Sequence, residues 1–285
     1  MKHIQYREYV HSLGNRDNQK LLGVTEVEIN PTELCNRACS FCPRYDPEIY
    51  PNRNLNMSVK TASVLSEQLF NAGYNGIISI CGFGEPLLNP KIKKIIKQFS
   101  PFHTELITNG DRILSGRILI KDLGVDSIMI DCYDGEEQVK KTKEIVKDCG
   151  IPYRIRDKYD DGTGDYKKYL HNNRGGILGQ QEIARPCYIT TYKMVVDWNG
   201  DILLCENDWS RKQKTFGNIH QRDVSDIWND KSFLDVRKKL IEGKRQELES
   251  CANCNVNGIL MGEQSVDLWK ERFGLESAER VNSVY

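Results

Sequence analysis

The sequence predicts an α/β fold, in which a partial TIM-like barrel of about five to six βα units precedes a small C-terminal domain with a β-hairpin and helices. Short apolar runs alternate with amphipathic segments from residue 24 to residue 157, as in βα units around a parallel sheet. The alternation then stops. Further on, Trp198-Asn199-Gly200 separates two apolar runs and indicates a hairpin.

The elements of the barrel follow from periodicity and capping signals. Strands are expected at residues 24–29, 77–81, 105–108, 127–131 and 153–156. A helix is expected after the N-cap residue Ser58, and others at residues 90–99, 112–123 and 136–147. The first helix would bury one face, formed by Ala62, Leu65, Leu69 and Phe70. About five units, fewer than a closed barrel needs, predict an open sheet with its chemistry at the carboxyl ends of the strands.

The C-terminal part has a different pattern. Strands are expected at residues 193–197 and 201–204, joined by a primed turn in which Asn199-Gly200 supplies the positive φ angles. Helices are expected at residues 224–228 and 233–241. The predicted division of the chain is a lead-in at 1–23, the barrel core at 24–157, a linker at 158–186, a second domain at 187–256 and a tail at 257–285.

Composition narrows the function. The 40 basic and 40 acidic residues balance, so no nucleic acid partner is expected. The longest apolar runs, such as residues 76–81, are too short to cross a membrane, and the N-terminus lacks the apolar core of a signal peptide. A cytoplasmic protein with no membrane partner is predicted. Ten cysteines in a reducing compartment indicate metal binding or redox chemistry.

The first cysteine group directly follows the first predicted strand. Cys35, Cys39 and Cys42 have the spacing C-x3-C-x2-C. Three thiolates on one loop can bind three irons of a [4Fe–4S] cluster and leave the fourth iron open. The alternatives are a zinc site completed by a distant residue, since structural zinc takes four ligands, or three unrelated buried thiols.

This motif, its place after the first strand, and the aromatic Phe41 before the last cysteine resemble the radical S-adenosylmethionine (radical SAM) superfamily. The resemblance implies that the open iron binds the amino and carboxylate groups of SAM, with Phe41 near the adenine. An external one-electron reductant, a flavodoxin or ferredoxin-like protein, would reduce the cluster. SAM would then be cleaved to methionine and a 5′-deoxyadenosyl radical, which abstracts a hydrogen atom from the substrate.

Two later segments agree with this resemblance. Residues 82–86 follow the second predicted strand and resemble the Gly-Gly-Glu-Pro element of the family, although Phe83 replaces the first glycine of the pair. In the family this element binds the SAM amino group, a role that the resemblance gives to Gly84, Glu85 and Pro86. Thr108 and Asn109 end the third strand and resemble the contact to the ribose region. The alternative for both segments is an ordinary turn.

The second cysteine group is Cys187, Cys205, Cys251 and Cys254. With the hairpin and the final C-x2-C, it resembles the SPASM/twitch extension of radical SAM enzymes. No cysteine follows Cys254, which matches the shorter twitch form with one auxiliary [4Fe–4S] cluster. A zinc ribbon is the alternative. A cluster with four thiolates has no open iron, so electron transfer is its expected role.

These ligand sets resemble the twitch-type aminocyclitol dehydrogenases, which oxidise a secondary alcohol of a small polar ring. In that family an arginine shortly before the first auxiliary cysteine contacts the substrate, and Arg174 is the nearest candidate catalytic residue here. One alternative is a peptide-modifying enzyme, an epimerase or a cross-linking maturase. Another is a non-catalytic iron–sulfur electron-transfer protein. The three other cysteines, Cys81, Cys132 and Cys149, are expected to be structural. The substrate cannot be identified from the sequence, but six further residues could line its cavity or lie on the surface: Tyr45, Tyr50, Arg154, Arg156, Tyr159 and His171.

Overall fold

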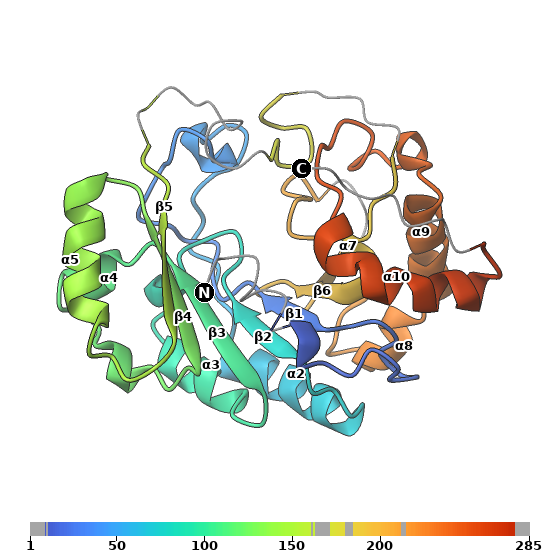
Figure 1. Ribbon diagram of the computed structural model, residues 1–285, viewed down its shortest axis with the longest axis horizontal. Coiled ribbons are helices and arrows are strands. Elements are labelled where there is room, and N and C mark those ends of the chain that lie inside the picture. Colours follow the sequence, from blue (N-terminus) through green and yellow to red (C-terminus); the bar gives the residue numbers. More distant parts are fainter. Residues whose placement is uncertain are drawn as a thin grey trace.

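The computed structural model describes residues 9, 11–160, 162, 172–179, 185–211 and 215–276 (Figure 1). Its centre is a seven-stranded sheet in the order β5-β4-β3-β2-β1-β6-β7. The strands are β1 (Glu26–Ile29), β2 (Ile77–Ile80), β3 (His103–Thr108), β4 (Ser127–Cys132), β5 (Tyr153–Asp157), β6 (Lys193–Val196) and β7 (Ile202–Leu203). Each of the five strands predicted in the barrel is present. The sheet does not close, which confirms the α/β partial barrel.

The position of β6 was missed by the sequence interpretation. The predicted hairpin is confirmed, because β6 and β7 pair in antiparallel fashion. In addition β6 pairs with β1 in parallel, with Glu26 opposite Lys193 and Ile29 opposite Val196. The other edge of β1 pairs in parallel with β2. The hairpin therefore continues the barrel sheet. The division of the chain into domains stays a prediction.

The helices surround this sheet (Figure 1). They are α2 (Val59–Asn71), α3 (Ile92–Gln98), α4 (Asp111–Leu114), α5 (Glu136–Val146), α7 (Ile189–Tyr192), α8 (Val224–Trp228), α9 (Lys231–Ile241) and α10 (Ile259–Phe273). Helices α2, α3 and α5 cover β1 to β5, whereas α8, α9 and α10 gather beyond β6. In the described parts of the chain, no helix has both the length and the apolar character to cross a membrane.

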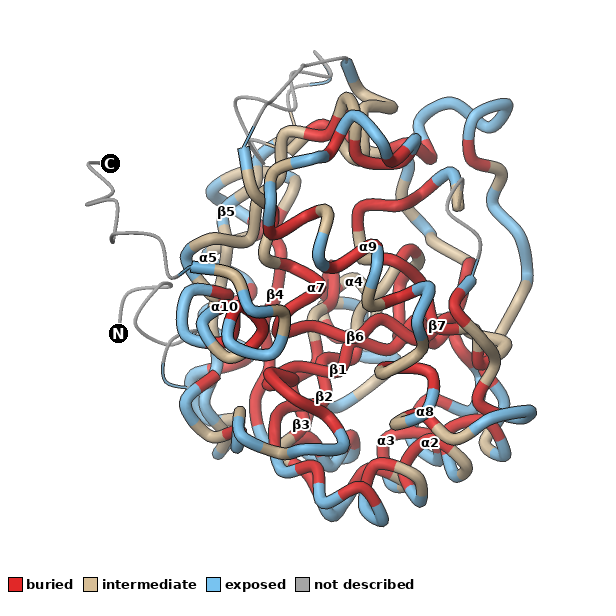
Figure 2. Tube along the Cα trace, turned by 90° about the vertical axis from the view of Figure 1, so that its right-hand side faces the viewer, coloured by how far each residue is buried: buried red, intermediate tan, exposed pale blue. Residues whose placement is uncertain are grey.

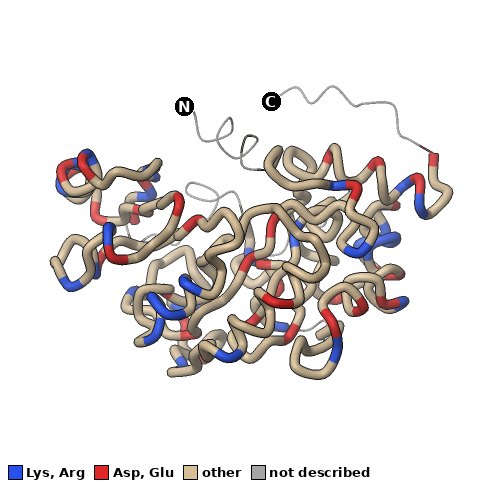
Figure 3. Tube along the Cα trace, turned by 90° about the horizontal axis from the view of Figure 1, so that it is seen from below, with Lys and Arg blue, Asp and Glu red and all other residues tan. Residues whose placement is uncertain are grey.

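The central strands carry most of the core. In Figure 2 strands β1, β2, β4 and β6 are buried along their length, while the outer turns of the helices are exposed. Charges of both signs are interleaved over the surface in Figure 3, as expected from the balanced composition. The packing places the carboxyl ends of the parallel strands together at one edge of the sheet.

The predicted helix after Ser58 is confirmed, but its buried face is narrower than expected. The Ser58 hydroxyl accepts a hydrogen bond of 3.0 Å from the Thr61 amide. Leu65 and Leu69 are fully buried, whereas Phe70 is 65% exposed, so its assignment to the buried face was wrong. Each residue of a helix is rotated by about 100° about the helix axis relative to the one before it, so Leu69 and Phe70 cannot both point into the core.

Two other local predictions were wrong. The helix expected at residues 112–123 is interrupted, leaving α4 and a short 3-10 turn at Ile120–Asp122. Gly116 adopts a φ of 70° after α4, a left-handed conformation that ends a helix. The hairpin turn is not primed, because only Gly200 of the pair Asn199-Gly200 has a positive φ. Instead a turn closed by the Gly200 amide on the Asp197 carbonyl precedes the glycine.

Helix α10 was also missed, since residues 257–285 were expected to be a tail. Its buried residues Val266 and Trp269 pack against the core, and the Trp269 indole donates to the Thr191 carbonyl at 3.0 Å. Gly262 faces α7 so closely that a Cβ atom there would lie 2.5 Å from the Tyr188 Cβ. The spacing of Val266, Trp269 and Phe273 is helical, so the sequence did carry a signal for this helix, although the internal Gly262 weakens it.

Neighbouring residues of α2 give a direct test of this packing. We expect Leu69→Ala to lower the free energy of unfolding by about 2–5 kcal/mol, because it leaves a cavity in the core. Phe70→Ala is the matched control and should change stability by less than about 0.5 kcal/mol. Urea denaturation followed by circular dichroism measures both. Equal effects of the two substitutions would contradict the orientation of α2.

Candidate active site

A cavity of about 360 Å³ lies where the carboxyl ends of the strands meet. Most of the predicted site residues outside the second cysteine group line this cavity. They are Cys35, Cys39, Phe41, Cys42, Gly84, Glu85, Thr108, Asn109 and Arg174. Pro86 does not line the cavity; it is buried at the start of a 3-10 turn, Pro86–Leu88, that directs Glu85 inward.

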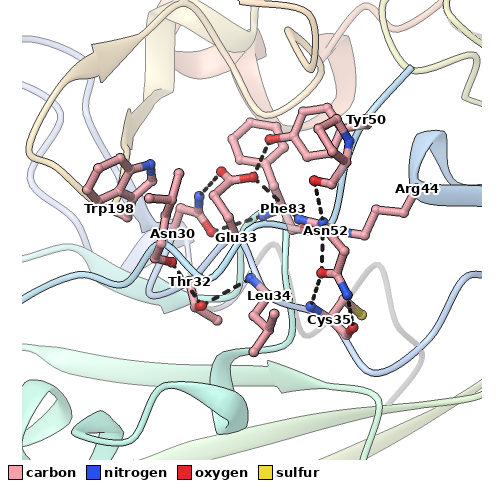
Figure 4. A network of polar contacts seen from close by, with 12 residues as sticks. Asn30, Thr32, Glu33, Leu34, Cys35, Arg44, Tyr50, Asn52, Phe83 and Trp198 are labelled. Carbon is pink, nitrogen blue, oxygen red and sulfur yellow. Dashed lines mark hydrogen bonds and ion pairs between the residues drawn. The ribbon is translucent and has the colours of Figure 1, made fainter. Parts of the chain in front are cut away.

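The cysteine loop leaves β1 and is held by backbone contacts. Asn52 clamps Cys35, since its side chain accepts from the Cys35 amide and donates to the Cys35 carbonyl, both at 2.9 Å (Figure 4). The Cys42 amide donates to the Cys39 carbonyl at 2.9 Å, which closes the second half of the loop. The clamp and the turn keep the three thiols on one wall of the cavity.

Burial dominates the ionisation of these thiols. It raises the pKa of Cys35 to about 11 and that of Cys39 to about 12, and it raises the pKa of Cys42 as well. Such thiols become thiolates only when a metal replaces the proton. In the described residues no three His, Cys, Asp or Glu side chains are arranged so that they could hold one metal ion. In a cube each thiolate binds a different iron, so the donor set fits a cluster better than a single ion.

Glu85 joins the ends of β2 and β3. Its carboxylate accepts hydrogen bonds from the Thr108 hydroxyl at 2.6 Å and from the Asn109 amide at 2.8 Å. Burial raises the pKa of Glu85 to about 7, although these hydrogen bonds favour the carboxylate. A Cβ atom on Gly84 would lie 2.2 Å from the Thr32 carbonyl oxygen, so only glycine allows this close approach to the cysteine loop.

Phe83 replaces the first glycine of the Gly-Gly-Glu-Pro element, and the structure gives a reason for this replacement. The Phe83 ring packs edge-on against Trp209, with ring centroids 4.9 Å apart, and faces Tyr50 at 6.3 Å. The guanidinium of Arg211 lies 4.6 Å from its centroid. A glycine would leave this aromatic cluster without its central ring. Phe83 therefore packs the cysteine loop against the chain that follows Cys205.

Beneath the loop, Glu33 is the centre of a buried polar network (Figure 4). Its carboxylate accepts hydrogen bonds from the Tyr50 hydroxyl at 2.5 Å and from Asn30 at 2.8 Å. Arg44 and Arg211 both form ion pairs with it, at 3.4 and 2.5 Å. Glu33 is only 3% exposed, so these partners compensate a buried charge.

The network also reaches the hairpin. Arg211 donates to Asp197 at 2.9 Å, and Asn30 donates to the same carboxylate at 2.7 Å. Asp197 directly follows β6, so one set of side chains ties the first cysteine loop to the segment after Cys205. The sequence interpretation missed these residues. Their positions are widely separated, and none belongs to a motif.

Arg174 lies on the wall that faces the first cysteine group. It is half-buried, and its guanidinium carbon is 5.7 Å from the centroid of Trp209. Its Nε atom has no hydrogen-bond partner among the described residues. Burial raises the pKa of the Cys42 thiol, and the positive charge of Arg174 opposes that rise. Arg174 is thus available to contact a molecule in the cavity.

Charged residues beyond the predicted set complete the cavity. Asp131, at the end of β4, forms ion pairs with Arg156 and with Lys158, the latter at 3.5 Å. Although burial raises the pKa of Asp131, these two cations outweigh it and lower the pKa. Burial lowers the pKa of Lys158 to about 8. Asp131 and Arg156 lie in β4 and β5, and Lys158 directly follows β5. Of the three, only Arg156 was considered from the sequence as a possible cavity residue, and it does line the cavity.

A second charged cluster extends from the cavity into the barrel. The ammonium of Lys193 lies 3.0 Å from Glu28, 3.3 Å from Glu26 and 3.6 Å from Glu206. Glu28 and Glu206 line the cavity, as does Cys81, for which only a structural role was expected. The cavity lining therefore contains both carboxylates and cations.

Other candidates lie elsewhere. Tyr45 and Tyr159 are exposed, while Arg154 lines a separate surface cavity. His171, also considered as a cavity residue, falls outside the described residues. The Cys132 thiol lies 3.4 Å from the Thr142 hydroxyl, away from both cysteine groups, and the Cys149 thiol donates to the Ile151 carbonyl at 3.3 Å.

The second cysteine group converges on another cavity. Cys187, Cys205, Cys251 and Cys254 all line a small internal cavity of about 20 Å³, together with the buried Arg245. Burial raises the pKa of Cys187 to about 11 and raises the pKa of the other three thiols as well. Four shielded thiols from distant parts of the chain could supply the four thiolate ligands of a metal centre. As at the first group, no three of the described side chains are placed to hold a single ion, so the arrangement suits a cluster better than zinc.

Comparison with known families defines the class of protein. Residues 29–170 match the radical SAM superfamily, and residues 187–255 match SPASM, the iron-sulfur cluster-binding domain. The chain belongs to the radical SAM superfamily and carries a SPASM domain. It is a radical SAM oxidoreductase that uses SAM and iron–sulfur clusters, which confirms the family and cofactors predicted from the cysteine motifs.

Individual relatives narrow the comparison. The chain is 28% identical over 273 residues to the S-adenosyl-L-methionine-dependent 2-deoxy-scyllo-inosamine dehydrogenase of Niallia circulans, covering 86% of this chain and 97% of that protein. The crystal structure of BtrN in complex with AdoMet and 2-DOIA matches with a TM-score of 0.67 and 25% identity, over 81% of this chain and 93% of BtrN. Native anSMEcpe with bound AdoMet shares the fold, with a TM-score of 0.52 and 13% identity over 86% of this chain and 96% of anSMEcpe.

The network around Glu33 gives a stability prediction. We expect Arg211→Met to lower the free energy of unfolding by about 3–5 kcal/mol, because Glu33 and Asp197 lose a cation that compensates their buried charges. Arg222 pairs with Asp230 on the surface, and Arg222→Met should change stability by less than about 1 kcal/mol. Chemical denaturation measures both. A loss below about 1 kcal/mol for Arg211→Met would contradict a structural role of the network.

Proposed function

We propose that this protein is a radical SAM dehydrogenase that oxidises a secondary alcohol of an aminocyclitol, or of a closely similar polar ring, to a ketone. The observation that carries this proposal is the similarity to a 2-deoxy-scyllo-inosamine dehydrogenase along 97% of that protein. The cavity of about 360 Å³, lined by charged and polar side chains, suits a small polar substrate beside SAM.

In this proposal Cys35, Cys39 and Cys42 hold the first [4Fe–4S] cluster. When bound, that cluster and SAM supply a 5′-deoxyadenosyl radical that takes a hydrogen atom from the substrate carbon. The chain's own residues shape the pocket for SAM. Phe41, whose ring centroid is 5.8 Å from that of Tyr133, offers an aromatic surface for the adenine.

The remaining SAM contacts come from the ends of β2 and β3. Gly84 brings the backbone edge close to the cysteine loop, where it can bind the SAM amino group, and Pro86 starts the turn behind it. Glu85 fixes Thr108 and Asn109, which we propose to face the ribose region. This chain of hydrogen bonds orients the cofactor before reaction, so that its reactive carbon points toward the substrate.

The second cysteine group, Cys187, Cys205, Cys251 and Cys254, holds an auxiliary [4Fe–4S] cluster in this proposal. With both clusters bound the oxidation would balance: the carbinol carbon would lose a hydrogen atom to the adenosyl radical, the hydroxyl would lose a proton to a base, and the auxiliary cluster would be the acceptor of the remaining electron. Arg174, a cation with an unpaired Nε among the described residues, is proposed to bind the substrate hydroxyl and promote its deprotonation.

The partners follow from the same chemistry. The first cluster needs an external one-electron reductant, such as a flavodoxin or ferredoxin-like protein. A cytoplasmic setting is proposed, because all ten cysteines are free thiols and disulfides are rare in that compartment. No membrane or nucleic acid partner is part of the proposal. The dehydrogenase similarity, which covers 86% of this chain, favours this reaction over the peptide-modifying and electron-carrier alternatives.

Metal content tests the two cluster sites. After anaerobic reconstitution, we expect about eight irons and about eight sulfides per chain, because each cube contributes about four of each. Cys35→Ala and Cys251→Ala should each lose about four irons, from different clusters. Cys149→Ala is the matched control and should keep all of them. Zinc at the second site, or about four irons in the unchanged protein, would contradict the auxiliary cluster.

The reaction is tested with the proposed substrate class. Incubation with SAM, a reductant and 2-deoxy-scyllo-inosamine deuterated at its carbinol carbons should give one ketone and one deuterated 5′-deoxyadenosine per turnover. Arg174→Lys, which keeps the charge, should retain more activity than Arg174→Met. Release of 5′-deoxyadenosine without deuterium would show that this ring is not the substrate. Absence of 5′-deoxyadenosine with every reductant would contradict the radical mechanism.

A further inference from the structure

We propose that Arg245 sets the reduction potential of the auxiliary cluster: its buried guanidinium donates hydrogen bonds toward the cluster sulfurs and makes the cluster easier to reduce. The inference rests on the proposed function, because it requires a cluster on the second cysteine group. Arg245 is a positioning residue in this role, since it acts on the electron acceptor and not on the substrate.

The position of Arg245 points to this role. It begins a 3-10 turn, Arg245–Glu247, between α9 and the final C-x2-C. The residue is 1% exposed and lines the same small cavity as the four cysteines. One guanidinium nitrogen donates to the Cys254 carbonyl at 2.7 Å, which fixes the side chain beside the cysteines.

The rest of the guanidinium lacks a partner within the described residues. Its Nε atom and its other terminal nitrogen are buried without hydrogen bonds. A buried, unpaired cation strongly destabilises a folded protein. Because the four cysteines surround the same cavity, an anionic cluster there would supply the missing acceptors and the missing negative charge.

A second buried arginine shows that this arrangement is particular to Arg245. Arg237 is also fully buried, but its guanidinium carbon lies 3.9 Å from the centroid of Trp269 and 4.0 Å from that of Trp228. It also donates to the Thr190 carbonyl at 2.7 Å. Although its other terminal nitrogen also lacks a hydrogen-bond partner among the described residues, Arg237 is stabilised by aromatic faces and carbonyls. Arg245 donates to one carbonyl, and it lines the cavity that the four cysteines line.

The electrostatics of the thiols agree with the geometry. Burial raises the pKa of Cys187, Cys251 and Cys254, and the charge of Arg245 opposes the rise at all three. The carboxylates Glu206 and Asp208 act in the other direction on members of the group. Arg245 is therefore the cation that stabilises negative charge in this cavity.

The consequence concerns electron transfer. Reduction adds one negative charge to a cluster, so a nearby cation and N–H donors to its sulfurs stabilise the reduced form and raise the potential. In the proposed oxidation the auxiliary cluster accepts the electron left on the substrate. Arg245 would favour this transfer over return of the hydrogen atom to the substrate.

The experiment compares Arg245→Met with Lys244→Met, which removes the same charge from the adjacent, exposed residue. Iron and sulfide are measured first, and then the auxiliary potential by redox titration with electron paramagnetic resonance. We expect Arg245→Met to lower the equilibrium constant for reduction of the auxiliary cluster at least tenfold, which is a fall in potential of about 59 mV for one electron. Lys244→Met should change this constant less than twofold. The ratio of ketone to 5′-deoxyadenosine should fall only in Arg245→Met.

Arg245→Lys keeps the charge but loses the fork of donors, so its potential should lie between those of the unchanged protein and Arg245→Met. If Arg245→Met does not retain the second cluster, the test rests on Arg245→Lys. A fall of at least twofold in the equilibrium constant for reduction of its auxiliary cluster then supports the inference, and an unchanged constant overturns it. A full iron content with an unchanged potential overturns the inference and leaves the proposed dehydrogenase intact. An unchanged protein without a second cluster overturns the proposed function itself.

Discussion

The parallel pairing of β1 on both of its edges is the constraint on which the site depends. With β2 on one side and β6 on the other, the loops that follow these strands leave the same edge of the sheet. One loop carries the first cysteine group, another carries Glu85, and the hairpin after β6 leads to Cys205. A shift of one residue in either pairing would turn the interior side chains outward and separate these loops.

Three buried charged side chains are a second feature of this protein. Glu33, Lys193 and Arg245 are each almost inaccessible to solvent, yet their environments differ. Glu33 has two arginines, and Lys193 has three carboxylates. Charges of this kind are retained only where partners compensate the loss of water. The first two are compensated within the protein, which marks them as parts of the scaffold, whereas Arg245 faces a cavity lined with thiols.

Much of the fold was predictable because its signals are local. The alternation of apolar residues located the five barrel strands, and the Ser58 cap located the start of α2. The errors arose where tertiary packing overrides local pattern. Phe70 looks as apolar as Leu69, but it is on the solvent side of α2. Helix α10 is stabilised by the hydrogen bond of Trp269 and by the close contact of Gly262 with α7. These are tertiary contacts, and the sequence of the helix does not reveal them.

The sequence by itself located the first cysteine group, because its three cysteines lie within eight residues with a spacing compatible with a cube that has an open iron. The resemblance to the radical SAM superfamily, and not the spacing alone, favoured that cluster over zinc. The sequence also supplied the four later cysteines and the element ending in Glu85. Only the tertiary structure decided what surrounds them: the network from Glu33 to Arg211, the cations near Arg174, and the buried Arg245 beside the second group. These contacts join residues far apart in the chain, and such pairs are selected by the packing of the whole sheet, not by any local preference.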